Sequence, residues 1–253
     1  MSASQASHAV AHSAIPDTAA RSRLYLGAAV LFAVVVTIGF TPTYWAPMFS
    51  GTLTAHPVIH VHATLFFAWL GFLILQSALV RAGRRAWHRE VGLFGIGLAS
   101  MMLFSGLLAA IVSLQAGLRG PRPDVVRATV ALSLSGILMF GAFVATAIAY
   151  RRRPDWHGRL MLLAGLELMQ PGIGRLTRLL PGVTFPAPIV IATVLVDLVL
   201  VAIVLIDRRS VGRIHPAWLT GGSALLVVHY ARLLIGRTET WTAFTNWLAA
   251  LGS

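Results

Sequence analysis

The chain has 253 residues, of which 57% are hydrophobic and only 11% are charged. A soluble domain carries about 25% charged residues, so the composition excludes a soluble globular or disordered protein and indicates an all-α, polytopic membrane helix bundle. All 20 basic residues are arginine, against eight acids, and the absence of cysteine excludes disulfides, thiolate metal sites and iron–sulfur clusters.

Residues 1–20 are mostly Ser, Ala and His, without an apolar run, which predicts a short disordered cytoplasmic tail rather than a signal peptide. Seven apolar stretches follow within residues 21–237, each close to the ~20 residues that cross ~30 Å of hydrocarbon. These predicted transmembrane helices lie at about 24–42, 57–80, 91–114, 128–150, 157–180, 187–206 and 217–236. Residues 238–253 carry Trp241, Phe244 and Trp247 at helical spacing, which predicts a short interfacial helix.

The arginines alternate between the two sides of the predicted bundle. Thirteen flank the N-terminus and the loops after the second, fourth and sixth predicted helices, and seven lie on the other side. Because arginine-rich loops stay in the cytoplasm, we expect a multi-pass protein of the bacterial inner (cytoplasmic) membrane. Its N-terminus is then cytoplasmic and its C-terminus periplasmic. This pattern accounts for the basic charge without nucleic acid, and it makes the lipid bilayer the expected partner.

Histidine precedes proline at the start of two predicted helices, in His56-Pro57 and His215-Pro216. Proline is favoured at the first helical position, so both histidines are predicted N-cap residues. His60 and His62 follow inside the helix over 57–80. They are about 200° apart around a regular helix and therefore cannot bind one metal ion together.

The positions of four histidines along the predicted helices indicate a cofactor. His62 and His229 lie about 9–10 Å below the arginine-poor ends of their helices, so these two side chains are expected to face each other at one level. His88 and His157 begin the third and fifth predicted helices at matching depth. Two pairs of imidazoles at two levels are what a membrane cytochrome with b haems requires. We therefore predict a b-type haem electron-transfer protein whose partner is quinone or another redox protein.

The helix predicted over 157–180 carries unusual charge for a membrane span. Arg175, Arg178 and Glu167 fall near the face that His157 begins. The two arginines are predicted partners for haem propionates. An ionised side chain at mid-membrane costs at least ~2.5 kcal/mol and indicates function. Glu167 and Asp197, an acid in the next helix, are therefore predicted to form a proton relay.

Two alternatives to haem remain open. A seven-helix zinc-dependent membrane hydrolase needs about three histidines at one depth with an acid and a water, and His60, His62 and His229 meet that need only if the helix over 57–80 is irregular. A cofactor-free transporter or accessory subunit would instead use Glu167, Asp197 and the neighbouring arginines as a polar pathway. The sequence leaves open whether the protein is an enzyme.

Three stretches of the chain resemble a group of uncharacterised bacterial multi-pass membrane proteins. They are HPVIHVHATLFF over 56–67, HREVG over 88–92 and RPDWHGRLMLL over 153–163. The resemblance covers most of the region from the second to the fifth predicted helix, and it implies membership of a membrane family without implying an activity. The His-Arg pair followed by Val-Gly is also similar to cytochrome b561 and ferric-reductase-like proteins, a resemblance that implies haem. The chain departs from that pattern because it lacks paired histidines on two successive helices.

Overall fold

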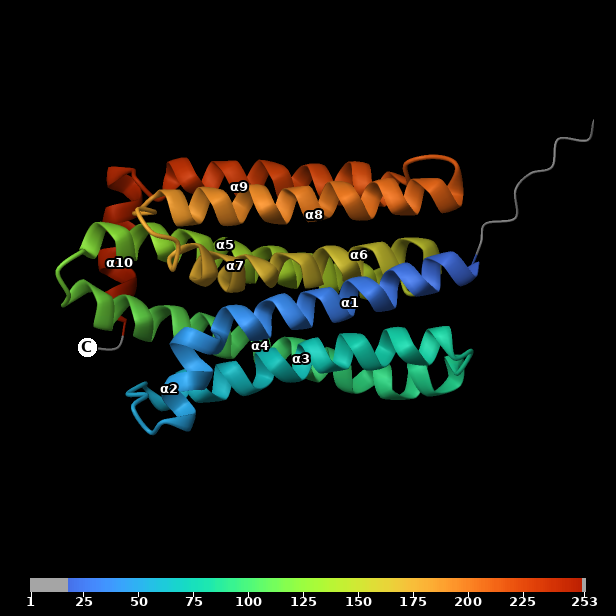
Figure 1. The fold of residues 1–253 in the computed structure, drawn as a ribbon, viewed down its shortest axis with the longest axis horizontal. Helices are drawn as coiled ribbons and strands as arrows, with labels where there is room; N and C mark the ends of the chain where they lie inside the picture. Colours follow the sequence, from blue (N-terminus) through green and yellow to red (C-terminus); the bar gives the residue numbers. More distant parts are fainter. Residues whose placement is uncertain (1–17, 252–253) are drawn as a thin grey trace, which may run out of the picture.

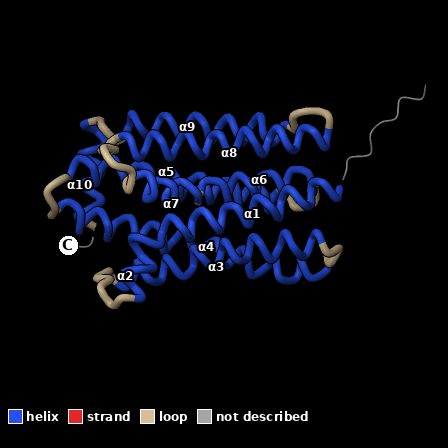
Figure 2. Tube along the Cα trace, in the orientation of Figure 1, coloured by secondary structure: helices blue, strands red, loops and turns tan. Residues whose placement is uncertain are grey.

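The structure, a computed structural model, describes residues 18–251, and within that range it contains helices and no strand (Figure 2). The elements in chain order are α1 (Thr18–Phe40), η1 (Thr41–Trp45), α2 (Ala46–Phe49), α3 (Pro57–Arg81), α4 (Arg85–Leu118), α5 (Pro123–Ala149), α6 (Pro154–Glu167), α7 (Met169–Thr177), α8 (Ala187–Val211), η2 (Trp218–Gly222), α9 (Ser223–Ile235) and α10 (Glu239–Ala250). The elements η1 and η2 are π-helical turns. The long helices run along one axis as a bundle (Figure 1), which confirms the predicted all-α class.

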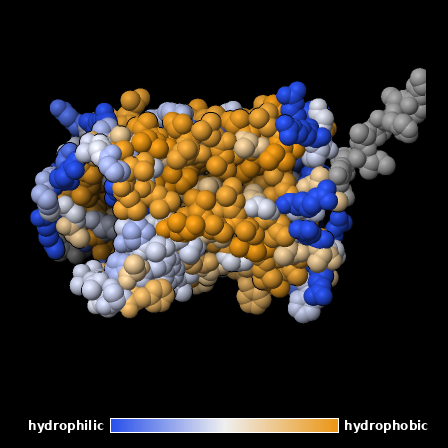
Figure 3. Space-filling view, viewed as in Figure 1, coloured by the Kyte–Doolittle hydropathy of each residue, from blue (hydrophilic) through white to orange (hydrophobic). Residues whose placement is uncertain are grey.

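Six helical stretches within residues 18–251 are long and apolar enough to cross a membrane. They are Ala19–Phe49, Pro57–Arg81, Arg85–Leu118, Pro123–Ala149, Ala187–Val211 and Trp218–Ile235. Apolar side chains cover the middle of the bundle on the face shown in Figure 3, and hydrophilic ones gather towards its two ends. The chain is therefore an integral membrane protein. Each of these six stretches contains most of one predicted apolar run.

The region predicted as a fifth apolar span, 157–180, is different. It forms two consecutive helices, α6 and α7, which run one after the other along the bundle (Figure 1), and it is not among the six apolar stretches. These helices pack against α1, α5 and α8, and every residue from 162 to 170 is buried. Because its neighbours are protein and not lipid, this segment tolerates polar residues that a lipid-facing span excludes.

The break between α6 and α7 has a cause in the sequence. Pro171 has no backbone N–H, and its ring clashes with the carbonyl four residues earlier, that of Glu167. The helix after the break approaches α1 unusually closely at Gly172. A Cβ on Gly39 would lie within 2.6 Å of three backbone atoms of Gly172. Glycine at both positions therefore lets α1 and α7 pack backbone against backbone.

The loops gather at the two ends of the bundle. The start of α1 and the α3–α4, α5–α6 and α8–η2 connections share one end (right in Figure 1), which we call the arginine-rich end because it holds Arg81–Arg85, Arg151–Arg153 and Arg208–Arg213. The opposite end is the arginine-poor end. The predicted tail over 1–20 lies outside the described residues except for Thr18–Ala20, which begin α1.

The last helix, α10, lies across the arginine-poor end and packs against α4 and α5 (Figure 1). Trp241 Nε1 donates to the Arg127 carbonyl at 2.9 Å. The rings of Trp241, Phe244 and Trp247 follow one another with centroids 5.2 and 5.7 Å apart. The C-terminal segment therefore has a helix with an aromatic row.

Candidate functional site

A cluster of ionisable side chains lies inside the bundle around Glu167, the last residue of α6. Glu167 is 3% exposed. One carboxylate oxygen, Oε1, accepts from Arg232 Nη1 at 2.7 Å, and the other, Oε2, lies 2.8 Å from His229 Nε2. Glu167 therefore lies inside the protein and not at its lipid-facing surface.

His229 joins Glu167 to the second predicted acid. The histidine ring is fully buried on α9, and its Nδ1 lies 2.6 Å from Asp197 Oδ1, near the middle of α8. Each ring nitrogen thus faces a carboxylate oxygen, and each short contact requires one shared proton. Either His229 is an imidazolium between two carboxylates, or one carboxyl group is protonated. We call Glu167, His229, Asp197 and Arg232 the central network.

Helix geometry explains how these residues meet. His229 and Arg232 are three residues apart and therefore share one face of α9. Gly136, on α5, leaves the room that Glu167 occupies, since a Cβ there would lie 3.1 Å from Glu167 Oε1.

The charges of the central network balance. Two carboxylates face one guanidinium and one imidazole, so the network is neutral when His229 is protonated. Burying a net charge away from water is costly, which favours a network that holds this one proton, whether on the imidazole or on a carboxyl group. Losing one proton would leave the network with a net charge of about −1.

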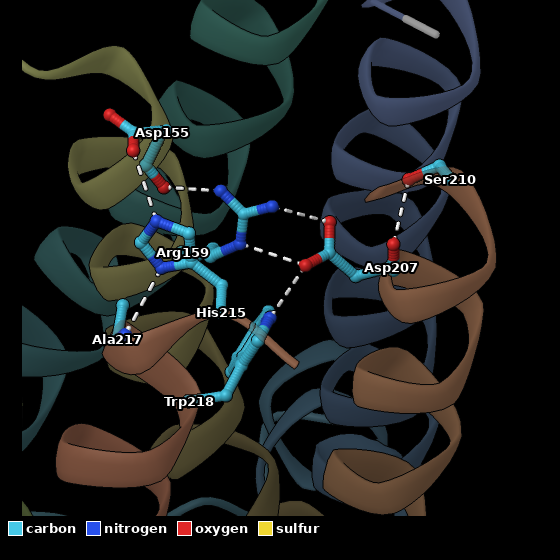
Figure 4. A network of polar contacts seen from close by, with 7 residues as sticks. All are labelled: Asp155, Arg159, Asp207, Ser210, His215, Ala217 and Trp218. Atoms are coloured by element: carbon cyan, nitrogen blue, oxygen red, sulfur yellow. Dashed lines mark hydrogen bonds and ion pairs between the residues drawn. The ribbon is translucent and has the colours of Figure 1, made fainter. Parts of the chain in front are cut away.

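A second network lies at the arginine-rich end (Figure 4). Arg159 on α6 and Asp207 on α8 are both 0% exposed. Arg159 Nε and Nη2 donate to the two oxygens of Asp207 at 2.8 and 2.9 Å, and Trp218 Nε1 donates to Asp207 at 2.8 Å. This bidentate pair ties α6, α8 and η2 together. Asp207 is followed in the chain by Arg208 and Arg209, but its partner is Arg159, 48 residues earlier.

His215 completes the second network. Its Nδ1 accepts from the Ala217 backbone N–H at 3.1 Å, so the Nε2 hydrogen donates to Asp155 Oδ2 at 3.0 Å. Partial burial acts to raise the pKa of Asp155, but the hydrogen bond from His215 and those from the backbone N–H groups of Asp155 and Trp156, with the charge of His215, together outweigh it and hold that pKa below its usual value. The predicted N-cap role of His215 is confirmed. His56 likewise accepts from the Val58 N–H, at 3.3 Å.

The structure brings one of the two predicted haem-ligand pairs together. The rings of His88 on α4 and His157 on α6 lie with centroids 6.2 Å apart and at 81° to each other. His157 Nδ1 donates to the Ala147 carbonyl at 2.8 Å. The side-chain amide of Gln76 lies against His88.

The other predicted pair is not brought together. His62 Nδ1 contacts Ser105 Oγ of α4 at 3.1 Å, whereas both nitrogens of His229 face carboxylates. His229 would have to give up one of these contacts to bind a haem iron, so a haem between His62 and His229 does not fit the residues present. His60 Nδ1 contacts Tyr44 Oη, at 3.1 Å. Among residues 18–251, no three His, Cys, Asp or Glu side chains are grouped to hold a metal ion.

The two predicted propionate partners lie away from the central network. The Arg175 guanidinium lies 4.0 Å from the centroid of the Phe40 ring, and its Nε donates to Thr43 Oγ1 at 3.0 Å. Arg178 is exposed. The cation that pairs with Glu167 is instead Arg232, which sequence reasoning missed. Its spacing of three residues from His229 was the available signal.

No family model matches the chain, and no curated protein or solved structure is significantly similar to it.

Proposed function

We propose that the protein is a proton-coupled transporter of the bacterial inner membrane, in which the central network takes up and releases the coupling proton. The observation that carries this proposal is the position of His229, fully buried between two carboxylates at 2.6 and 2.8 Å. An ionisable group within a membrane segment indicates a proton or substrate pathway. Four such groups linked in one chain of contacts strengthen that indication.

The geometry gives the proton a route through His229. Asp197 and Glu167 contact opposite nitrogens of the imidazole, so a proton gained at one carboxylate can be matched by a proton lost to the other. The predicted relay of Glu167 and Asp197 thus needs a histidine between its two acids. Arg232 keeps Glu167 the more stably ionised of the two, because a guanidinium bonded to a carboxylate favours its charged form.

The helix break supports a transport role. Discontinuous helices in secondary transporters place free backbone groups beside the substrate and ion sites. Here the break at Leu168 directly follows Glu167. A purely structural ion pair has no need of such a break.

The arginine distribution supports the orientation of the transporter. Thirteen of the 20 arginines belong to the N-terminal side in the predicted topology, and positively charged loops are retained in the cytoplasm. In this proposal the arginine-rich end faces the cytoplasm and the arginine-poor end, with α10, faces the periplasm.

Infrared difference spectroscopy of the purified protein tests the proton site. Titration is expected to produce a C=O stretch of a buried protonated carboxyl group, and Asp197→Asn is expected to remove that band, because Asp197 lacks the guanidinium partner of Glu167. Asp124→Asn, at an exposed position, is the matched control and should leave the band unchanged. A folded protein without any buried carboxyl band across its stable pH range would contradict the proposal.

A second candidate function rests on the adjacency of His88 and His157. We infer that these two residues are the ones that would hold a b haem for electron transfer with quinone or another redox protein, since a histidine held through Nδ1–H to a carbonyl is typical of metal-ligating histidines. Protein purified from haem-replete cells should then show a Soret band and sharp bands on reduction. His88→Ala and His157→Ala should each remove them, whereas His62→Ala should not. A colourless preparation would contradict this candidate.

A further inference from the structure

Only one of the three guanidinium nitrogens of Arg232, Nη1, bonds within the central network. Nη1 donates to Glu167 Oε1 at 2.7 Å and lies 3.4 Å from Ser135 Oγ. Nε and Nη2 are buried and have no hydrogen-bond partner among residues 18–251, although the residue is only 3% exposed. Buried N–H groups are nearly always paired. These two donors therefore indicate a ligand.

Arg159 shows what the same two donors bind elsewhere in this protein. Its Nε and Nη2 hold the two oxygens of Asp207 at 2.8 and 2.9 Å. This edge of a guanidinium matches the spacing of two oxygens on a carboxylate or a similar oxyanion. On Arg232 the corresponding edge has no carboxylate from residues 18–251 on it.

We propose that the free edge of Arg232 binds the carboxylate of a small monovalent organic acid, which is the substrate carried with the proton. This inference rests on the proposed transport function and names its substrate class.

Polar side chains extend from the central network towards the arginine-poor end. Thr193 precedes Asp197 by one turn of α8, is 0% exposed, and has no partner for its Oγ1 among the described residues. Arg232 follows His229 by one turn of α9, and Gln170, 6% exposed, follows Glu167 by one turn. Thr193, Arg232 and Gln170 each lie one turn nearer the arginine-poor end than their partner in the central network, because α8 runs opposite to α7 and α9.

Apolar side chains occupy the opposite side of the central network. Leu163, Leu200 and Leu225 lie about one turn from Glu167, Asp197 and His229 towards the arginine-rich end, and all three are at most 3% exposed. The Arg159–Asp207 pair follows beyond them. The anion therefore reaches Arg232 from the arginine-poor end.

Charge balance sets the stoichiometry. The central network is neutral with His229 protonated, so a bound carboxylate gives it a charge of about −1, which is costly inside a membrane. Uptake of one proton by Asp197 restores neutrality. Substrate and proton are thus bound one to one, and their transport moves no net charge.

Isothermal titration calorimetry of the full chain in detergent tests the site, with sodium formate and sodium acetate as probes. Runs in two buffers of different ionisation enthalpy report proton uptake. We expect saturable binding of both anions with uptake of about one proton per anion, and no saturable binding of chloride. Arg232→Lys is expected to weaken the affinity about tenfold or more, because a lysine keeps the charge but lacks the two-donor edge.

Two further variants make the result decisive. Arg178→Lys, an exposed arginine near the same end, is the matched control and should bind like the wild type. Thr193→Val, which keeps the side-chain shape, should also weaken binding, and it serves if Arg232→Lys fails to fold. Absence of saturable binding by the folded wild type, equal affinity in Arg232→Lys, or binding without proton uptake would each overturn the inference. The infrared band of Asp197, measured without anion, tests the proton site independently. If the band is present but the anion does not bind as expected, the substrate inference fails while the proton site stands.

Discussion

Asp207→Ala is expected to lower the free energy of unfolding by about 3–5 kcal/mol, the cost of leaving one partner of a buried ion pair uncompensated. The change leaves Arg159 without its ion-pair partner, since this 0% exposed residue donates from both Nε and Nη2 to Asp207. It also removes the acceptor of Trp218 Nε1. Thermal or denaturant unfolding in detergent, followed by circular dichroism, measures the loss.

Two control variants accompany this prediction. Asp155→Ala removes a carboxylate whose side chain is 46% exposed, and it should change stability far less. The double replacement Arg159→Met with Asp207→Leu removes both charges together and should recover much of the lost stability. If Asp207→Ala unfolds with the same transition midpoint as the wild type, the bidentate pair contributes no stability.

Glu167→Ala is expected to cost a similar amount, about 3–5 kcal/mol, because it leaves a guanidinium and an imidazole buried without their acceptor. Glu167→Gln should fold with a smaller loss, since the amide oxygen still accepts from Arg232 and the amide nitrogen can donate to His229 Nε2. Both variants should lose proton coupling. The same unfolding measurement, with proton uptake in proteoliposomes, separates the two effects.

Ser135→Ala provides the matched control for this series. Its hydroxyl lies 3.4 Å from Arg232 Nη1, a long contact, so its removal should leave both stability and coupling close to those of the wild type. Coupling that survives in Glu167→Gln would show that Glu167 is a structural counterion and not part of the relay.

The fold was largely predictable because span length and apolar composition are local properties. Six predicted apolar runs correspond to helices, and the His-Pro pairs at 56 and 215 marked helix starts correctly. The exception was the region 157–180. Its hydropathy and Pro171 could be read from the sequence, but the burial of residues 162–170 by neighbouring helices depends on tertiary packing.

The site was less predictable because pairing depends on how each helix is rotated. The cost of a carboxylate in a membrane singled out Glu167 and Asp197, and the structure links both to His229. The prediction paired His229 with His62 only because they lie at similar depth along their helices, but the two side chains have different contacts. Arg175 was placed near Glu167 by a regular helix, and the break at Leu168 removes that regularity.

The enclosure of α6 and α7 has a consequence for the assembly of the protein in the cell. We expect a segment with Arg159, Glu167 and Arg175 to be too polar to leave the translocon for lipid alone, since a charge near the helix centre, where Glu167 lies, costs about 2.5–3.5 kcal/mol on insertion. Its compensating partners, Asp207, His229 and Arg232, lie on α8 and α9, which are synthesised later. We therefore expect the segment of α6 and α7 to stay beside the translocon until α8 and α9 arrive, and these segments to enter the membrane together.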